Sequence, residues 1–234
     1  MRVCKTDKKG KTTTSLVAEY KYDILGRRIE KKLNSKENDI WYNWNNWNND
    51  WNTTTIRYIY SGQDIIKEQT IQISKKWKET LKDEKEYIYW KWVDDVLAMI
   101  TTDNWWLLND FIWLLTKDKS KKTKEKIYFY QKDHLWSTTR ILDNKWNIVE
   151  EYIYDVFWKA YKKRWLFTKG LWFSRINSDT WNTRLYTWRE YDKETNLYYY
   201  RARYYSPDIG RFISRDPIWM ADQINLYTYV GNNP

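Results

Sequence analysis

Glycine and proline, the residues that most often form tight turns, are scarce in this sequence. There are 6 glycines and 3 prolines in 234 residues, whereas glycine alone makes up about 7% of an average protein. Tight turns between strands usually need a residue at positive φ, which glycine adopts without steric cost. By this count the chain lacks the turn-forming residues that a fold of many short strands requires.

Cysteine, histidine and long apolar runs are scarce as well, and each shortage excludes a class of protein. The single cysteine, Cys4, cannot form an internal disulfide. One histidine, His134, and one cysteine are too few for a typical zinc site, and no phosphate-binding loop sequence is present, so we expect no metal and no cofactor. No run approaches the roughly 20 apolar residues of a membrane span.

The excess of basic residues is moderate and only partly clustered. The 41 lysines and arginines exceed the 31 acidic residues by 10. Their densest run, residues 117–126, contains no aromatic residue and is typical of a solvated loop, so nucleic-acid binding is disfavoured. An asparagine-rich stretch near residues 34–52 is low in complexity and indicates a loop or insertion.

Tyrosine, by contrast, is abundant and recurs in a pattern. The chain has 21 tyrosines, and an aromatic–any–aromatic unit appears at 20–22, 58–60, 87–89, 128–130 and 152–154. Because side chains alternate along a strand, each unit places two rings on one face. Helical patterns are weak throughout. The sequence therefore predicts an all-β fold of repeated hairpins, with about 24 to 41 residues between units.

Tryptophan is also abundant, with 18 residues, and some of it falls where a turn is expected. Residues 138–142 and 148–154 have the composition of two strands, and the turn between them, 143–147, contains Trp146. Tryptophan is among the poorest choices for a turn position at positive φ. The indole at this place contradicts the hairpin that its neighbours predict.

Several segments carry a resemblance to a known family. The sequence YDILGR at 22–27 is similar to the tyrosine–aspartate repeat of the RHS and YD-repeat family. Residues 189–217 together with 225–234 resemble the RHS repeat-associated core domain almost position for position, and looser matches lie at 58–64, 87–99 and 133–158. The resemblance covers most of the chain outside 34–52 and 103–126.

The resemblance implies a fold and a division of the chain. Members of the family form a β-sheet strip of repeated hairpins that curves and spirals into a hollow shell, which the core domain closes at one end. Residues 1–125 are expected to form the strip, as part of such a shell, with the low-complexity insertion near 34–52. Residues 126–234 are expected to form the core domain, ending before its second Asp-Pro-x-Gly motif.

The function that the resemblance implies is structural. In many bacterial members the shell encloses a C-terminal toxin, so we expect a shell and core segment of a polymorphic-toxin or cell-surface delivery protein. Its partners would be its own toxin domain, which this chain lacks, and an immunity or delivery protein. The protein would be secreted or held at the cell surface, with its export signal outside this chain. The alternative is a surface module without a toxin that binds carbohydrate or another cell, and a decayed gene remnant is a third interpretation.

The core domain of this family also cuts its own chain, by chemistry similar to that of an aspartic protease. Two aspartates that lie close together share a proton, so one acts as base toward water and the other as acid toward the leaving group. Asp216, followed by Pro217, matches the first of these aspartates, with Trp219 in the glycine place of the motif. The partner would lie beyond Pro234, so only a full-length form is expected to act as an autoprotease. Taken alone, Asp216 also fits a turn-capping aspartate before proline.

The resemblance isolates the tryptophans that do not fit. The family pattern has glycine at seven tryptophan positions, which are Trp90, Trp92, Trp136, Trp146, Trp158, Trp188 and Trp219. We hypothesise that the gene comes from a bacterium that reads the UGA codon as glycine. Adding 18 tryptophans to 6 glycines gives 24 glycines in 234 residues, about 10%, which is normal for a hairpin-rich fold.

Overall fold

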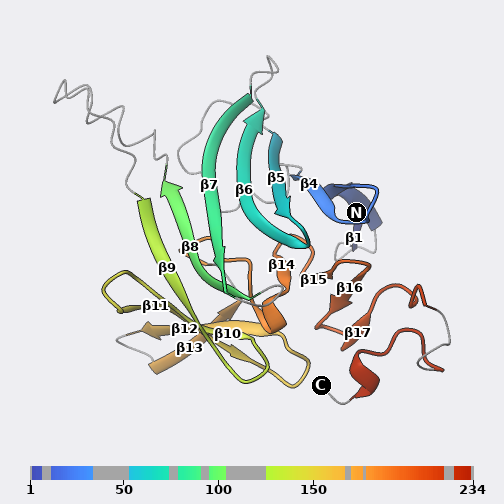
Figure 1. The fold of residues 1–234 in the computed structure, drawn as a ribbon. Coiled ribbons are helices and arrows are strands. Elements are labelled where there is room, and N and C mark those ends of the chain that lie inside the picture. The colour runs from blue at the N-terminus through green and yellow to red at the C-terminus, as the bar shows by residue number, and fades with distance from the viewer. Residues whose placement is uncertain are drawn as a thin grey trace. The chain divides into compact units, whose positions relative to one another are not determined.

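The computed structural model describes residues 2–6, 12–33, 53–73, 79–90, 95–103, 125–166, 170–175, 178–218 and 224–232 (Figure 1). The chain divides into two compact units, Met1–Tyr128 and Phe129–Pro234. The stretch near 34–52, most of the basic run at 117–126, and the residues Trp92 and Trp219 lie outside the described residues.

The first unit is built from antiparallel hairpins that pair in chain order. A separate hairpin joins β1 to β2, and from β3 to β8 each strand pairs antiparallel with the next. Figure 1 shows β5 to β8 as neighbouring, curved strands. The strands are β1 (Arg2–Thr6), β2 (Thr12–Leu16), β3 (Ala18–Tyr22), β4 (Arg28–Leu33), β5 (Thr53–Ser61), β6 (Asp64–Ile73), β7 (Glu79–Tyr89) and β8 (Val96–Asp103).

The second unit contains two antiparallel sheets. Strands β9 to β13 pair in chain order, and β14 to β17 form a smaller sheet of four. Strand β9 (Glu125–Lys132) crosses the boundary between the units, and its last four residues belong to the second unit. The other strands are β10 (Thr138–Leu142), β11 (Ile148–Tyr154), β12 (Ala160–Leu166), β13 (Gly170–Arg175), β14 (Glu190–Asp192), β15 (Leu197–Tyr200), β16 (Arg203–Ser206) and β17 (Arg211–Phe212).

Helical structure in the described parts of the chain is limited to short 3₁₀ turns, named η1 (Tyr186–Trp188) and η3 (Val230–Asn232). Everything else that is regular there is antiparallel β-structure. The expectation of an all-β fold made of repeated hairpins is therefore confirmed.

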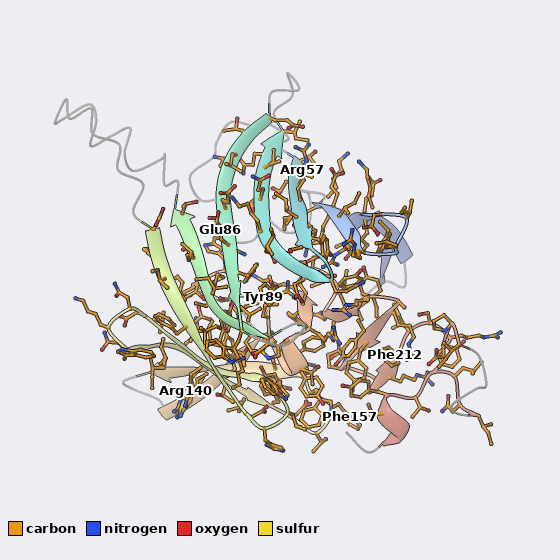
Figure 2. The ribbon with its side chains drawn as sticks, in the orientation of Figure 1. Arg57, Glu86, Tyr89, Arg140, Phe157 and Phe212 are labelled. Carbon is orange, nitrogen blue, oxygen red and sulfur yellow. The ribbon has the colours of Figure 1, made fainter. Side chains whose placement is uncertain are left out.

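The aromatic units hold neighbouring strands together in a repeated way. In three of the five units, 58–60, 87–89 and 152–154, the first tyrosine is buried, with 2% to 5% of its surface exposed. The second donates its hydroxyl proton to a backbone carbonyl of the preceding strand: Tyr60 to Arg28 at 2.9 Å, Tyr89 to Ile65 at 2.7 Å and Tyr154 to Thr138 at 2.6 Å. Tyr89 is labelled in Figure 2. Alternation along the strand accounts for this arrangement, because both rings of a unit lie on one face.

The opposite face of the first unit carries exposed and partly exposed charges that pair across strands. Its ion pairs include Lys21–Glu30 at 2.6 Å, Arg57–Glu79 at 2.8 Å and Lys67–Glu84 at 2.9 Å. Pairs of this kind contribute at most about 1 kcal/mol each, because water and salt screen them. The sheet is therefore held by its tyrosine face, while the charges keep the other face compatible with water.

A bulge follows the turn in several hairpins. Tyr22 pairs with Arg28 while Lys21 pairs with Glu30, which leaves Ile29 without a residue opposite it in β3. The same shift occurs at Ile66, Leu97 and Val149. These four residues are between 38% and 40% exposed. The bulge changes the phase of the alternation, so that an apolar side chain faces partly outward.

Candidate functional site

Asp216, the predicted catalytic residue, lies in a turn after β17. Its backbone N–H donates to the carbonyl of Leu226 at 3.0 Å, and its Oδ1 accepts the N–H of Ile218 at 3.1 Å. The carboxylate thus caps the turn that contains Pro217. This geometry matches the structural interpretation of an aspartate before proline, and it leaves Oδ2 for a second contact.

That second contact is an ion pair with Arg203 of β16. Arg203 Nη1 lies 2.7 Å from Asp216 Oδ2, and both side chains are 20% exposed. The guanidinium of Arg203 also lies over the ring of Phe212, 3.7 Å from its centroid. Cation–π contact of this kind restrains the arginine, which in turn fixes the direction of the carboxylate. From the sequence, alternation along residues 197–205 places Arg203 among tyrosines and suggests a cation–π contact, but it does not indicate the ion pair with Asp216.

Among the described residues, the structure shows a single carboxylate at this place, so the catalytic role of Asp216 stays a prediction. One oriented, partly accessible carboxylate can accept a proton from water, but the leaving group requires a second acid. In the described part of the chain, no group of three or more His, Cys, Asp and Glu side chains could hold a metal ion. His134 is an exposed residue of the turn that begins at Asp133.

Beside this turn lies an aromatic cluster made by Tyr186, Tyr200, Tyr205, Phe212 and Tyr229. Phe212 is labelled in Figure 2. Tyr205 and Tyr229 have ring centroids 4.8 Å apart, and Phe212 lies 5.9 Å from Tyr205. Burial, and after it the neighbouring Tyr229, raises the pKa of Tyr205 to about 12. Burial likewise raises the pKa of Tyr200 and Tyr186. These hydroxyls therefore stay protonated at neutral pH, and the cluster acts as core that supports the turn of Asp216.

A second group of polar residues is buried in the second unit, and the sequence did not single it out. The Glu150 side chain is fully buried and lies 3.6 Å from Lys162 Nζ. Its Oε1 accepts the N–H of Thr180 at 2.7 Å and the hydroxyl of Ser178 at 3.0 Å, and its Oε2 accepts the hydroxyl of Tyr152. We call these five residues the Glu150 cluster. It ties segment 178–184 to strands β11 and β12.

The chemistry of the Glu150 cluster is structural. Burial raises the pKa of Tyr152 well above its usual range, and the charge of Glu150 and the hydrogen bond between them raise it further. Lys162 is 4% exposed at its side chain and pairs with Asp179 as well, at 2.6 Å. Each buried charge is thus compensated, as buried charges must be. A signal did exist in the sequence, because alternation places Glu150 on the same face as Tyr152 and Tyr154.

Parts of the sequence are similar to known proteins, and the fold of the whole chain is similar to solved structures. No family model matches the chain. It is 53% identical over 49 residues to salivary gland surface protein 1 of Aedes aegypti, which covers 21% of this chain and 1% of that protein. It is 45% identical over 66 residues to toxin subunit YenC2 of Yersinia entomophaga, which covers 28% of this chain and 7% of the relative.

Among solved structures, the chain resembles the crystal structure of TcdB2-TccC3 along its whole length. The TM-score is 0.64 at 19% sequence identity, and the match covers 100% of this chain and 10% of the other. At this identity the likeness establishes a shared fold. The chain spans a tenth or less of the relatives and structure named here. Within the described residues, no helix has the length and apolar character to cross a membrane.

Proposed function

We propose that the chain is a shell segment of an RHS-repeat toxin-delivery protein. The observation that carries this proposal is the fold, a succession of antiparallel hairpins that matches TcdB2-TccC3 over the full chain. The similarity to toxin subunit YenC2 supports it from the sequence side. In this proposal residues 1–125 belong to the repeat strip and residues 126–234 to the core domain.

A strip of hairpins is well suited to enclosing another polypeptide. Successive hairpins pair edge to edge, which satisfies the backbone groups that an open strand would expose. Three tyrosine hydroxyls, those of Tyr60, Tyr89 and Tyr154, each bond to a backbone carbonyl of the strand before their own. In the longer protein, we infer, the wall formed in this way surrounds a toxin domain that follows the core. Its partners are that toxin and an immunity or delivery protein, and it acts outside the cell that makes it or at that cell's surface.

Protease protection of the whole gene product tests the enclosure. The segment that follows the core is expected to resist trypsin within the full-length protein, and to be digested when it is expressed alone. Digestion at the same rate in both forms would contradict the proposal. The DNA that flanks the gene gives an independent check, since a neighbouring immunity gene is expected.

We propose in addition that Asp216 is one of two aspartates that cut the full-length chain. Its support is the oriented carboxylate and its ion pair with Arg203. The Asp216→Asn variant should remain uncut on a gel, while the matched Asp208→Asn variant is cut like the wild type. Asp208 is a suitable control because it is an acidic residue on the surface of the same unit, paired with Lys159. Unchanged cleavage in Asp216→Asn would remove the catalytic role.

A surface-binding module is the second candidate, and one observation favours it. The short, highly identical match is to a salivary gland surface protein. Binding of the purified chain to a carbohydrate array distinguishes the two candidates. The shell proposal predicts no glycan-specific binding by residues 1–234.

A further inference from the structure

Four turns among the residues that the structure describes have the same hydrogen bonds, and one of the four has glycine in its fourth place. Each begins at an aspartate whose N–H donates to the carbonyl four residues later, and the residue in fourth place donates its N–H back to the aspartate carbonyl at 3.0 to 3.1 Å. The aspartate Oδ1 accepts two further backbone N–H groups at 2.8 to 2.9 Å. The four turns are Asp23 to Arg27, Asp133 to Ser137, Asp143 to Asn147 and Asp155 to Lys159.

The residue in fourth place has left-handed backbone geometry in every turn. Its φ is 74° for Gly26, and 65°, 66° and 64° for Trp136, Trp146 and Trp158. Side chains with a Cβ rarely adopt this conformation, and bulky ones are genuine outliers there, whereas glycine adopts it freely. The fourth place of this turn is therefore occupied once by glycine, the residue that suits positive φ, and three times by tryptophan, one of the least suitable residues.

The left-handed conformation extends to other tryptophans. Trp181 and Trp188 both have φ of 60°. With the three tryptophans of the turns, this makes five tryptophans with left-handed backbone geometry. The structure describes eight tryptophans in all, which are Trp90, Trp136, Trp146, Trp158, Trp165, Trp172, Trp181 and Trp188. Four of the five were expected from the family pattern, and Trp181 was not. Trp90, which was expected, does not have positive φ.

The surroundings of these side chains give no common reason for an indole. Trp136, Trp146 and Trp181 are 49%, 68% and 50% exposed. Trp188 is buried, yet its Nε1–H has no hydrogen-bond partner among the described residues. Buried indole N–H groups usually find a partner. Three of the five make aromatic contacts: Trp158 stacks on Tyr186 at 4.3 Å, Trp146 stacks on Phe129 at 5.0 Å, and Trp188 meets the edge of Tyr130 at 5.2 Å. Lys132 Nζ lies over the rings of Trp136 and Trp188, 5.2 Å and 4.2 Å from their centroids. What all five share is the backbone conformation.

We propose that residues 136, 146, 158, 181 and 188 are glycine in the native protein. A host that reads UGA as glycine accounts for all five at once, because decoding that codon as tryptophan writes the same residue at every site. The assignment does not depend on the proposed shell function. It removes the exposed rings at 136, 146 and 181 from consideration as a carbohydrate-stacking surface.

Peptide masses from the protein of its native host test the assignment directly. Trypsin should release peptides 133–140, 146–159, 176–184 and 185–189, which together contain all five sites. Peptide 22–27, with Gly26, serves as the internal control because both readings give it the same mass. Glycine at all five positions is expected. Tryptophan at any of them in the native protein overturns the proposal.

A recombinant series gives a second readout that does not need the host. Starting from the chain with tryptophan at position 146, Trp146→Gly and Trp146→Ala both remove the indole, but only the glycine variant relieves the left-handed strain. Trp146→Gly is expected to unfold at a higher temperature than Trp146→Ala. Equal melting temperatures of the two variants would show that position 146 has no requirement for glycine, and would contradict the assignment there.

Discussion

Replacing Glu150 by glutamine tests whether the buried Glu150 cluster holds the second unit together. The substitution keeps the shape of the side chain and removes its charge, which leaves the buried Lys162 with the exposed Asp179 as its acidic partner. Removing one member of a buried ion pair destabilises by roughly 3–5 kcal/mol. Because Asp179 remains and the amide oxygen can still accept the N–H of Thr180, we expect the lower end, about 3 kcal/mol.

The adjacent residue provides a matched control. Glu151 lies on the opposite face of β11 and pairs with Arg140 at 3.0 Å and with Lys163 at 2.8 Å, its side chain being 23% exposed. The same Glu→Gln change there should cost no more than about 1 kcal/mol, since exposed pairs are screened.

Thermal unfolding of the two variants, followed by circular dichroism, compares the positions. At about 2–4 °C per kcal/mol for a chain of this size, Glu150→Gln should lower Tm by roughly 6 to 12 °C and Glu151→Gln by at most about 4 °C. Equal shifts for the two variants would refute the burial of Glu150 and the strand register that produces it.

Three further predictions address the tyrosine contacts, the turns and their charges. Tyr89→Phe should lower the free energy of unfolding by about 1 kcal/mol, measured in urea, because it removes the hydroxyl that donates to the carbonyl of Ile65. Gly210→Ala should destabilise more than Gly62→Ala in the same assay: both glycines have positive φ, but an added Cβ meets a phenylalanine ring at 2.7 Å only at Gly210. The side chain of Asn147 is the main cause that holds the pKa of Asp143 below its ordinary value. The turn should therefore be stabilised above the unfolded pKa of about 3.9 and lose this contribution as pH falls through the folded value, and Asn147→Ala should raise the pKa of Asp143 in an NMR titration.

Alternation and turn chemistry made much of the fold predictable. The aromatic units at 58–60 and 87–89 predicted strands with two rings on one face, and β5 and β7 have that geometry. The aspartates that begin the turns are local signals, because their carboxylates bond to backbone groups two and four residues away. Such features depend on neighbours in sequence, so a single chain reveals them.

Contacts between distant residues were not predictable in the same way. Arg203 and Asp216 meet because β16 and β17 pair and the chain then turns back, and no spacing rule gives that. The position of Trp181 at positive φ lies outside regular strands, where neither alternation nor a hairpin pattern applies. The bulges at Ile29 and Ile66 likewise follow from pairing, and they explain why apolar residues face outward there.

Electron cryo-microscopy of the whole gene product would show whether residues 1–234 form part of an enclosing shell. We expect a closed, hollow wall of antiparallel hairpins that includes residues 1–234, with the polypeptide that follows the core located inside it. A sheet that remains open, with that polypeptide folded separately outside, would contradict the shell function and leave the surface-binding alternative.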